Sequence, residues 1–213
     1  MSILGAFYKT AGGGAALDVA NTWTALQTFS NQIAVAPGVG AGKMELLFNN
    51  TLSANGNGVT FTPSSALDMK TAGKYSAFLV TVMGTMRVAT DIGLIINGHT
   101  DYDYSLILND STTVSGLNVT TAGSYEMLAS ELGGNGEFIY CSAIIRPLFF
   151  PSASGMKFCF ESQGGTAIQG NQVGNGIDVT TVTDGELDSI QIIASNATGI
   201  QEDTEINIYG VLR

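Results

Sequence analysis

Hydrophobic and polar positions alternate with a period of two over much of the chain from Lys43 onwards. Successive side chains of a β-strand point to opposite faces, so this alternation predicts half-buried strands and not helices. It is clearest in Lys74–Met83, Met86–Ile96, Ser105–Leu108, Glu137–Ile145, Met156–Phe160, Ser189–Ile193 and Glu205–Val211. It is weaker in Met44–Phe48, Val59–Thr62, Leu117–Thr120 and Ile177–Val182.

Glycine and asparagine separate these segments, most clearly at Asn55–Gly58, Asn97–Gly98 and Gly133–Gly136. Both residues tolerate positive φ, which hairpins and sharp corners require. About ten short strands in the body of the chain predict an all-β fold, an antiparallel β-sandwich or jelly roll. Only Asp18–Phe29 and Ser124–Leu132 are compatible with helices.

Two segments fifty residues apart, 67–75 and 117–125, each begin with leucine and end in Thr-Ala-Gly-x-Tyr. In each, a short strand is expected to end at Thr-Ala, the glycine to turn the chain, and the tyrosine to begin the next strand. The tyrosine ring is expected to be half buried, with its hydroxyl reaching solvent or a carbonyl. Two copies do not indicate a solenoid, so the repeat predicts similar corners within one sandwich.

Residues 1–42 have a different composition from the rest of the chain. Glycines at 12–14 and the run Pro37–Gly42 flank Asn21–Ser30, which holds the single tryptophan. Glycine-rich flanks cannot build a core, so we expect 1–42 to be an extended N-terminal arm and 43–213 the folded domain. Trp23, Leu26 and Phe29 are then expected to dock on a partner surface. The alternative is that they cover one end of their own domain.

The charge balance excludes some partners. Eight Lys and Arg against 18 Asp and Glu give a formal net charge of −10. The cations are scattered, whereas a phosphate backbone must be met by clustered ones, so we expect no nucleic acid partner. No apolar stretch approaches the roughly 18–20 residues of a membrane span, and no signal peptide is visible, so no membrane association is expected. Cys141 and Cys159 are expected to be reduced packing residues, because two isolated thiols do not make a disulfide framework.

Candidate chemistry is sparse. His99 is the only histidine, and neither a nucleophile elbow nor a carboxylate pair with a specific spacing accompanies it. Asp101 and Asp103 provide oxygens of the kind that bind calcium, and Asp184–Asp188 and Glu202–Glu205 are further acidic clusters, but we expect both groups to be solvated loop carboxylates. Zinc needs more histidines or cysteines than the chain offers. We therefore expect no enzyme activity, no metal and no cofactor.

Three stretches resemble known families. Asn21–Ser30 resembles the "NTWTxxQTF" element near the N-termini of tailed-bacteriophage fibre and other virion-surface proteins. The pair Asp188–Asn196 and Ile206–Leu212 is similar to the closing strands of small phage jelly-roll proteins. The Thr-Ala-Gly-x-Tyr corners at 71–75 and 121–125 look like those of trimeric tumour-necrosis-factor-like jelly rolls.

These resemblances imply a structural protein on the virion surface, made in the host cytoplasm. They imply a homotrimer whose arm contacts the major capsid protein or another virion structural protein. The single copy of the N-terminal element and the short length favour a capsid decoration (cement) protein over a long tail fibre. The alternative is a receptor- or carbohydrate-binding module of the fibre or spike type. In that case Tyr102 and Tyr104 would stack on sugars, as would Tyr125 and Tyr140, while Asp101 and Asp103 bind hydroxyls.

Overall fold

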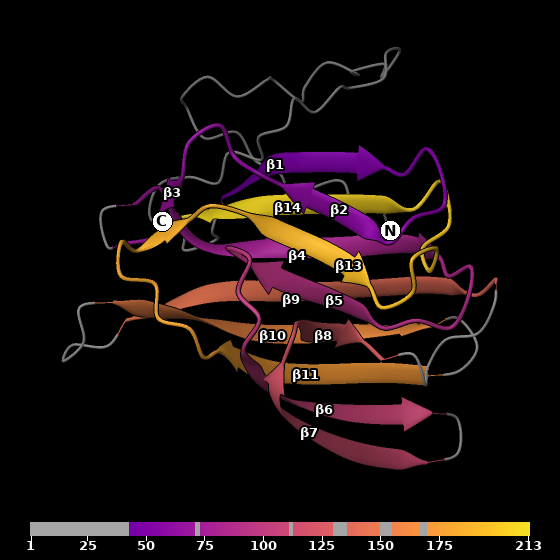
Figure 1. Ribbon diagram of the computed structural model, residues 1–213. Coiled ribbons are helices and arrows are strands. Elements are labelled where there is room, and N and C mark those ends of the chain that lie inside the picture. Colours follow the sequence, from indigo (N-terminus) through magenta and orange to yellow (C-terminus); the bar gives the residue numbers. More distant parts are fainter. Residues whose placement is uncertain (1–42, 71–72, 111–112, 130–135, 150–154, 167–169) are drawn as a thin grey trace, which may run out of the picture. The chain divides into compact units, whose positions relative to one another are not determined.

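The computed structural model describes residues 43–70, 73–110, 113–129, 136–149, 155–166 and 170–213. These residues form fourteen β-strands and no helix (Figure 1). The strands build antiparallel sheets, which confirms the predicted all-β sandwich class. No helix of the described ranges has the length and hydrophobicity needed to cross a membrane.

The larger sheet has eight strands. In spatial order they are β1 (Met44–Thr51), β14 (Glu205–Leu212), β4 (Tyr75–Thr85), β9 (Phe138–Phe149), β10 (Met156–Thr166), β11 (Gly170–Asp178), β6 (Tyr102–Asp110) and β7 (Val114–Ala122). The smaller sheet lies over it in Figure 1 and has four strands. In spatial order these are β2 (Gly58–Phe61), β13 (Ile190–Ala194), β5 (Ile92–Ile96) and β8 (Tyr125–Leu128). β3 (Leu67–Asp68) and β12 (Glu186–Leu187) pair with each other as a separate two-stranded antiparallel sheet.

The order of the strands is that of a jelly roll with two added hairpins. Without the β10–β11 and β6–β7 hairpins, the sheets are β1-β14-β4-β9 and β2-β13-β5-β8. The chain passes from one sheet to the other between β1 and β2, β4 and β5, β8 and β9, and β13 and β14, as in a double-sheet jelly roll. The two hairpins extend only the larger sheet, so its outer face, which is turned away from the smaller sheet, is unusually broad.

The core lies between the two sheets and follows the period of two. On β4, the inward residues Phe78, Val80 and Val82 are buried, and the smaller sheet contributes Leu94 and Ile192 from β5 and β13. Burying a side chain of this kind contributes about 1.5–3 kcal/mol. The described residues therefore hold a continuous core of their own.

Most of the predicted strands are present, but several boundaries differ. Met86–Ile96 is not one strand, because β5 begins at Ile92. The strand predicted at Ile177–Val182 is misplaced, since β11 ends at residue 178. The helix-compatible interpretation of Ser124–Leu132 is wrong for the described part of that range, because Tyr125–Leu128 form β8, which pairs with β5 and buries most of its side chains against the larger sheet. The other helix-compatible piece, Asp18–Phe29, lies outside the described residues.

The two Thr-Ala-Gly-x-Tyr corners differ from the expectation in several respects: before the first corner β3 already ends at Asp68, and the tyrosine hydroxyls donate to Glu45 and Ser162 side chains. Tyr75 begins β4 and Tyr125 begins β8, as predicted, and β7 ends at Ala122. Both rings are nearly or fully buried rather than half buried. Each ring covers a glycine of the larger sheet, Gly210 under Tyr75 and Gly176 under Tyr125. The repeat thus marks two places where a tyrosine fills the volume that a glycine leaves open.

Candidate functional site

The residues predicted to dock the arm, Trp23, Leu26 and Phe29, lie outside the described residues, so their role stays a prediction.

The predicted ligand-contact segment divides between core and surface. Tyr102 and Tyr104 point into the sandwich, and both are buried. The Tyr102 hydroxyl accepts the N–H of Ile96 at 2.8 Å, and the Tyr104 hydroxyl donates to the Glu126 carboxylate at 2.9 Å. The expectation that these rings stack on sugars is corrected, because burial removes both from the surface.

Burial also sets the chemistry of these phenols. It is the largest cause that raises the pKa of Tyr102, and the nearby charge of Asp178 adds to it. It likewise raises the pKa of Tyr104, next to the Glu126 carboxylate. Both phenols therefore stay protonated at neutral pH and serve as hydrogen-bonding core residues.

The two aspartates of the segment have separate surroundings. Asp103 points outward from β6 and accepts the N–H of Thr121 at 3.0 Å. Asp101 precedes the strand, and its Oδ1 is buried without a hydrogen-bond partner. Within the described ranges, no group of three or more His, Cys, Asp or Glu side chains is placed to hold a metal ion.

His99 forms a partly buried pair with an aspartate that the sequence did not suggest. Its Nδ1 lies 2.5 Å from Oδ2 of Asp178, which is fully buried at the end of β11. The other oxygen of Asp178 accepts the N–H of Thr180 at 2.9 Å. Among the described residues, no serine or cysteine forms a hydrogen bond with this imidazole. The pair fixes the turn after β5 against the larger sheet.

The outer face of the larger sheet carries most of the exposed large hydrophobic residues. One of them, Leu46, adjoins the partly buried residues Tyr209, Leu79 and Ile144, which are cross-strand neighbours on β14, β4 and β9. Met44 and Val211 extend this group by one more pair. Met44 and Leu46 are 53% and 44% exposed. We call these six residues the apolar patch.

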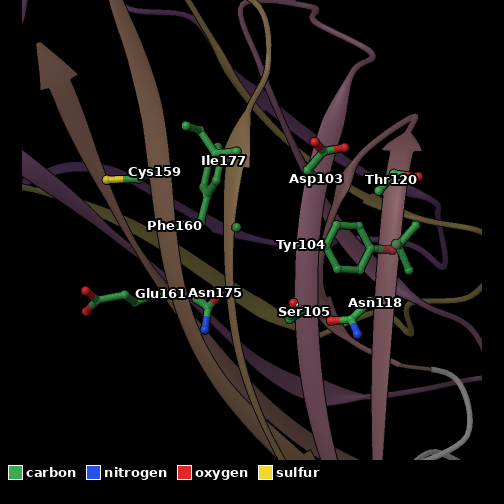
Figure 2. Close-up of a pocket in the computed structure, with 12 residues that line it drawn as sticks. Asp103, Tyr104, Ser105, Asn118, Thr120, Cys159, Phe160, Glu161, Asn175 and Ile177 are labelled. Carbon is green, nitrogen blue, oxygen red and sulfur yellow. Dashed lines mark hydrogen bonds between the residues drawn. The ribbon is translucent and has the colours of Figure 1, made fainter. Parts of the chain in front are cut away.

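The outer face of the two added hairpins is more polar and is hollowed. We call the outward residues of β10, β11, β6 and β7 the polar half. A shallow depression of about 490 Å³ lies there (Figure 2). Its rim includes Asp103, Glu161 and Asn175, together with Ser105 and Asn118, which face each other across β6 and β7 with a 2.6 Å hydrogen bond. Such groups offer hydrogen-bond donors and acceptors to a polar ligand.

Electrostatic pairing leaves this depression close to neutral. Glu161 forms an ion pair with Arg146 at 2.7 Å, across β10 and β9. Of the two carboxylates that line the depression, Asp103 is the one without an ion pair. Cys159 also lines the depression, while Cys141 faces the core from the opposite side of the sheet, so the two thiols are separate and reduced.

No family model, no curated protein and no solved structure matches this chain.

Sequence reasoning missed the depression because it missed β11. The segment Gly170–Asp178 is rich in glycine and asparagine, a composition typical of turns. Its inward positions Gly174 and Gly176 are occupied from above by the ring and hydroxyl of Tyr125. At these positions a side chain of β8 takes the place of the hydrophobic residues that a half-buried strand normally carries itself. The sequence of β11 alone therefore does not predict a strand.

Proposed function

We propose that this chain is a non-enzymatic structural protein of a tailed-bacteriophage particle, acting as a capsid decoration protein. Its jelly roll associates as a homotrimer, and residues 1–42 attach it to the major capsid protein or another virion structural protein. The resemblance of Asn21–Ser30 to the N-terminal element of virion-surface proteins supports the attachment. The apolar patch supports the association of copies.

The apolar patch is the main observation that supports the proposed association of copies. Monomers rarely expose large contiguous apolar surfaces, and such surfaces mark interaction sites. In the apolar patch, cross-strand neighbours such as Leu46, Tyr209 and Leu79 leave no polar residue between them. The inward positions of the same strands are already filled by the core, so no described part of the chain remains to bury these side chains, and we propose that another molecule does so.

The charge distribution favours a second copy of the chain as that molecule. Each copy carries a formal charge of −10, so most approaches between copies are repulsive. The outward residues of β1, β14, β4 and β9 include two charged side chains, Glu205 and Arg146, and Arg146 is paired with Glu161 of β10. This part of the surface therefore carries little of the net negative charge, and copies can meet here with little of that repulsion.

The association is tested by light scattering coupled to size exclusion, with Leu46→Asp compared with Ile107→Asp. Both residues are exposed on outer-face strands, but only Leu46 belongs to the apolar patch. We expect the mass of a trimer for the wild type and for Ile107→Asp, and dissociation for Leu46→Asp. A monomeric wild type, or equal behaviour of the two variants, would contradict the proposed interface.

The attachment is tested with a chain that lacks residues 1–36. We expect this chain to fold and to form the same oligomer, since the core lies within the described residues. We also expect it to be missing from purified particles, as judged by mass spectrometry and imaging of particles made with either version. Particles that hold the truncated chain at the wild-type level would refute the role of the arm.

A further inference from the structure

Within the described ranges, Tyr140 is the one exposed tyrosine on the outer face whose hydroxyl forms a hydrogen bond across a neighbouring strand. It belongs to β9, and its hydroxyl donates to Oδ1 of Asn171 on β11 at 2.8 Å. β11 lies two strands away, which is about 9.5 Å in a sheet. To reach that far, the side chain must lie along the sheet and cross β10, instead of standing up from the surface.

The strand under the ring has no side chain at the crossing point. Gly165 of β10 is opposite both Tyr140 and Asn171 in the register of the sheet. A Cβ atom on Gly165 would come within 3.2 Å of the Tyr140 hydroxyl and within 2.5 Å of the Gly170 carbonyl oxygen. The hydroxyl end of the Tyr140 side chain therefore lies over the β10 backbone. Tyr140 is 43% exposed, so a large part of its side chain is open to solvent.

A fixed, open ring of this kind is a stacking platform. The hydrogen bond to Asn171 holds the ring before any ligand arrives, so binding costs less side-chain entropy. Phe138 is similarly exposed two residues away on the same strand and the same face, and its side chain has no hydroxyl with which to form such a tie.

Polar and apolar groups alternate along the surface between this ring and the depression. Gln163 and Asn171 flank the ring, and Val173 and Ile107 pair next to them across β11 and β6. The rim of the depression begins at Glu161, four residues from Gly165 along β10, or about 13 Å. A ligand that uses both places must be extended, with apolar faces and polar edges.

We propose that the polar half, with the Tyr140 ring as its platform, binds a neutral saccharide chain. Sugar rings present a C–H face that packs on an aromatic ring, and hydroxyl edges that bond to amides, hydroxyls and carboxylates. Asp103 and Glu161 disfavour an anionic polymer, since no lysine or arginine lines the depression. This site does not overlap the apolar patch and does not depend on the location of the protein in a particle.

The experiment uses the full chain on an array of neutral and anionic oligosaccharides, followed by affinity electrophoresis in gels that contain dextran, mannan or galactan. We expect the wild type to bind at least one neutral saccharide. Tyr140→Ala should weaken that binding about tenfold or more, because the platform is lost. Tyr140→Phe, which keeps the ring but not the hydrogen bond to Asn171, should cause a smaller loss.

Phe138→Ala is the matched control and should bind within about twofold of the wild type. Thermal unfolding and oligomeric mass are measured for every variant, so that misfolding or lost avidity is not mistaken for a lost site. The proposal is overturned if the wild type binds no neutral saccharide, if it binds only anionic ones, or if Tyr140→Ala binds as the wild type does. None of these outcomes bears on the apolar patch, whose test is the mass of the Leu46→Asp variant.

Discussion

Replacing Gly176 by alanine should destabilise the domain, because the tyrosine of the second corner occupies the space that the new methyl group needs. A Cβ atom at this position would lie 2.7 Å from Cβ of Tyr104 and 2.8 Å from two ring carbons of Tyr125. Tyr125 cannot move aside easily, since its ring is stacked on Phe160 with a centroid distance of 4.7 Å. Its hydroxyl is also bound to Ser162 at 2.7 Å.

The expected cost derives from these contacts. Overpacking a filled core by one methyl group costs about 1–3 kcal/mol. The loss of glycine's extra freedom in the unfolded chain offsets about 0.4–1 kcal/mol of that. Gly116 of β7 provides the control, because a Cβ there would have only the Leu106 carbonyl oxygen nearby, at 4.0 Å. Neither glycine has a positive φ, so backbone strain does not contribute to the difference between them.

Guanidinium unfolding of the two variants and the wild type measures the difference. We expect Gly116→Ala to be neutral or slightly stabilised, and Gly176→Ala to lose stability relative to it. In a thermal scan, each kcal/mol corresponds to a shift of about 2–4 °C for a domain of this size. If Gly176→Ala is as stable as Gly116→Ala, the ring of Tyr125 does not fill this space and the reasoning fails.

Two further predictions concern titratable groups. Burial raises the pKa of Tyr125 to about 12 from its ordinary value near 10, so between these values the folded state holds a proton that the unfolded state has lost. The free energy of unfolding should therefore fall as the pH rises from about 10 to about 12, and Tyr125→Phe should flatten that slope; an unchanged slope in the variant would contradict the assignment. Burial also raises the pKa of Cys141 to about 12, whereas Cys159 is partly exposed and its pKa is raised by partial burial. Iodoacetamide should thus modify Cys159 alone in the native protein and both thiols after unfolding, and mass spectrometry that finds native Cys141 modified would count against its burial.

The extent to which the sequence predicted this molecule differs between strands. Strands such as β4 and β9 carry their own alternation, so the chain alone was enough to predict them. The short strand β8 did not, because its four residues have no clear period and only pairing with β5 makes them extended. β11, which faces β8 across the sandwich, could not be predicted either. Its inward positions Gly174 and Gly176 carry no hydrophobic side chain, because they leave room for Tyr125.

For the candidate sites, too, the sequence predicted one part and the tertiary structure decided the other. Alternation correctly places Tyr102 and Tyr104 on one side of β6 and Asp103 on the other, but a period of two does not say which side meets the second sheet. Only the packing of the sheets buried the two rings and left Tyr140 outside. The hydrogen bond from Tyr140 to Asn171 joins two residues that lie thirty-one positions apart in the sequence, and no local pattern predicts it.

By itself, the sequence determined the all-β class and the net charge, because alternation and composition are properties of the chain read in order. The tertiary structure decided which face of each strand became core, which glycines lie under tyrosines, and how the outer face divides into an apolar patch and a polar half. The physical reason is that each of these depends on contacts between strands far apart in the chain, and a side chain's surroundings exist only once those strands have paired and the two sheets have packed.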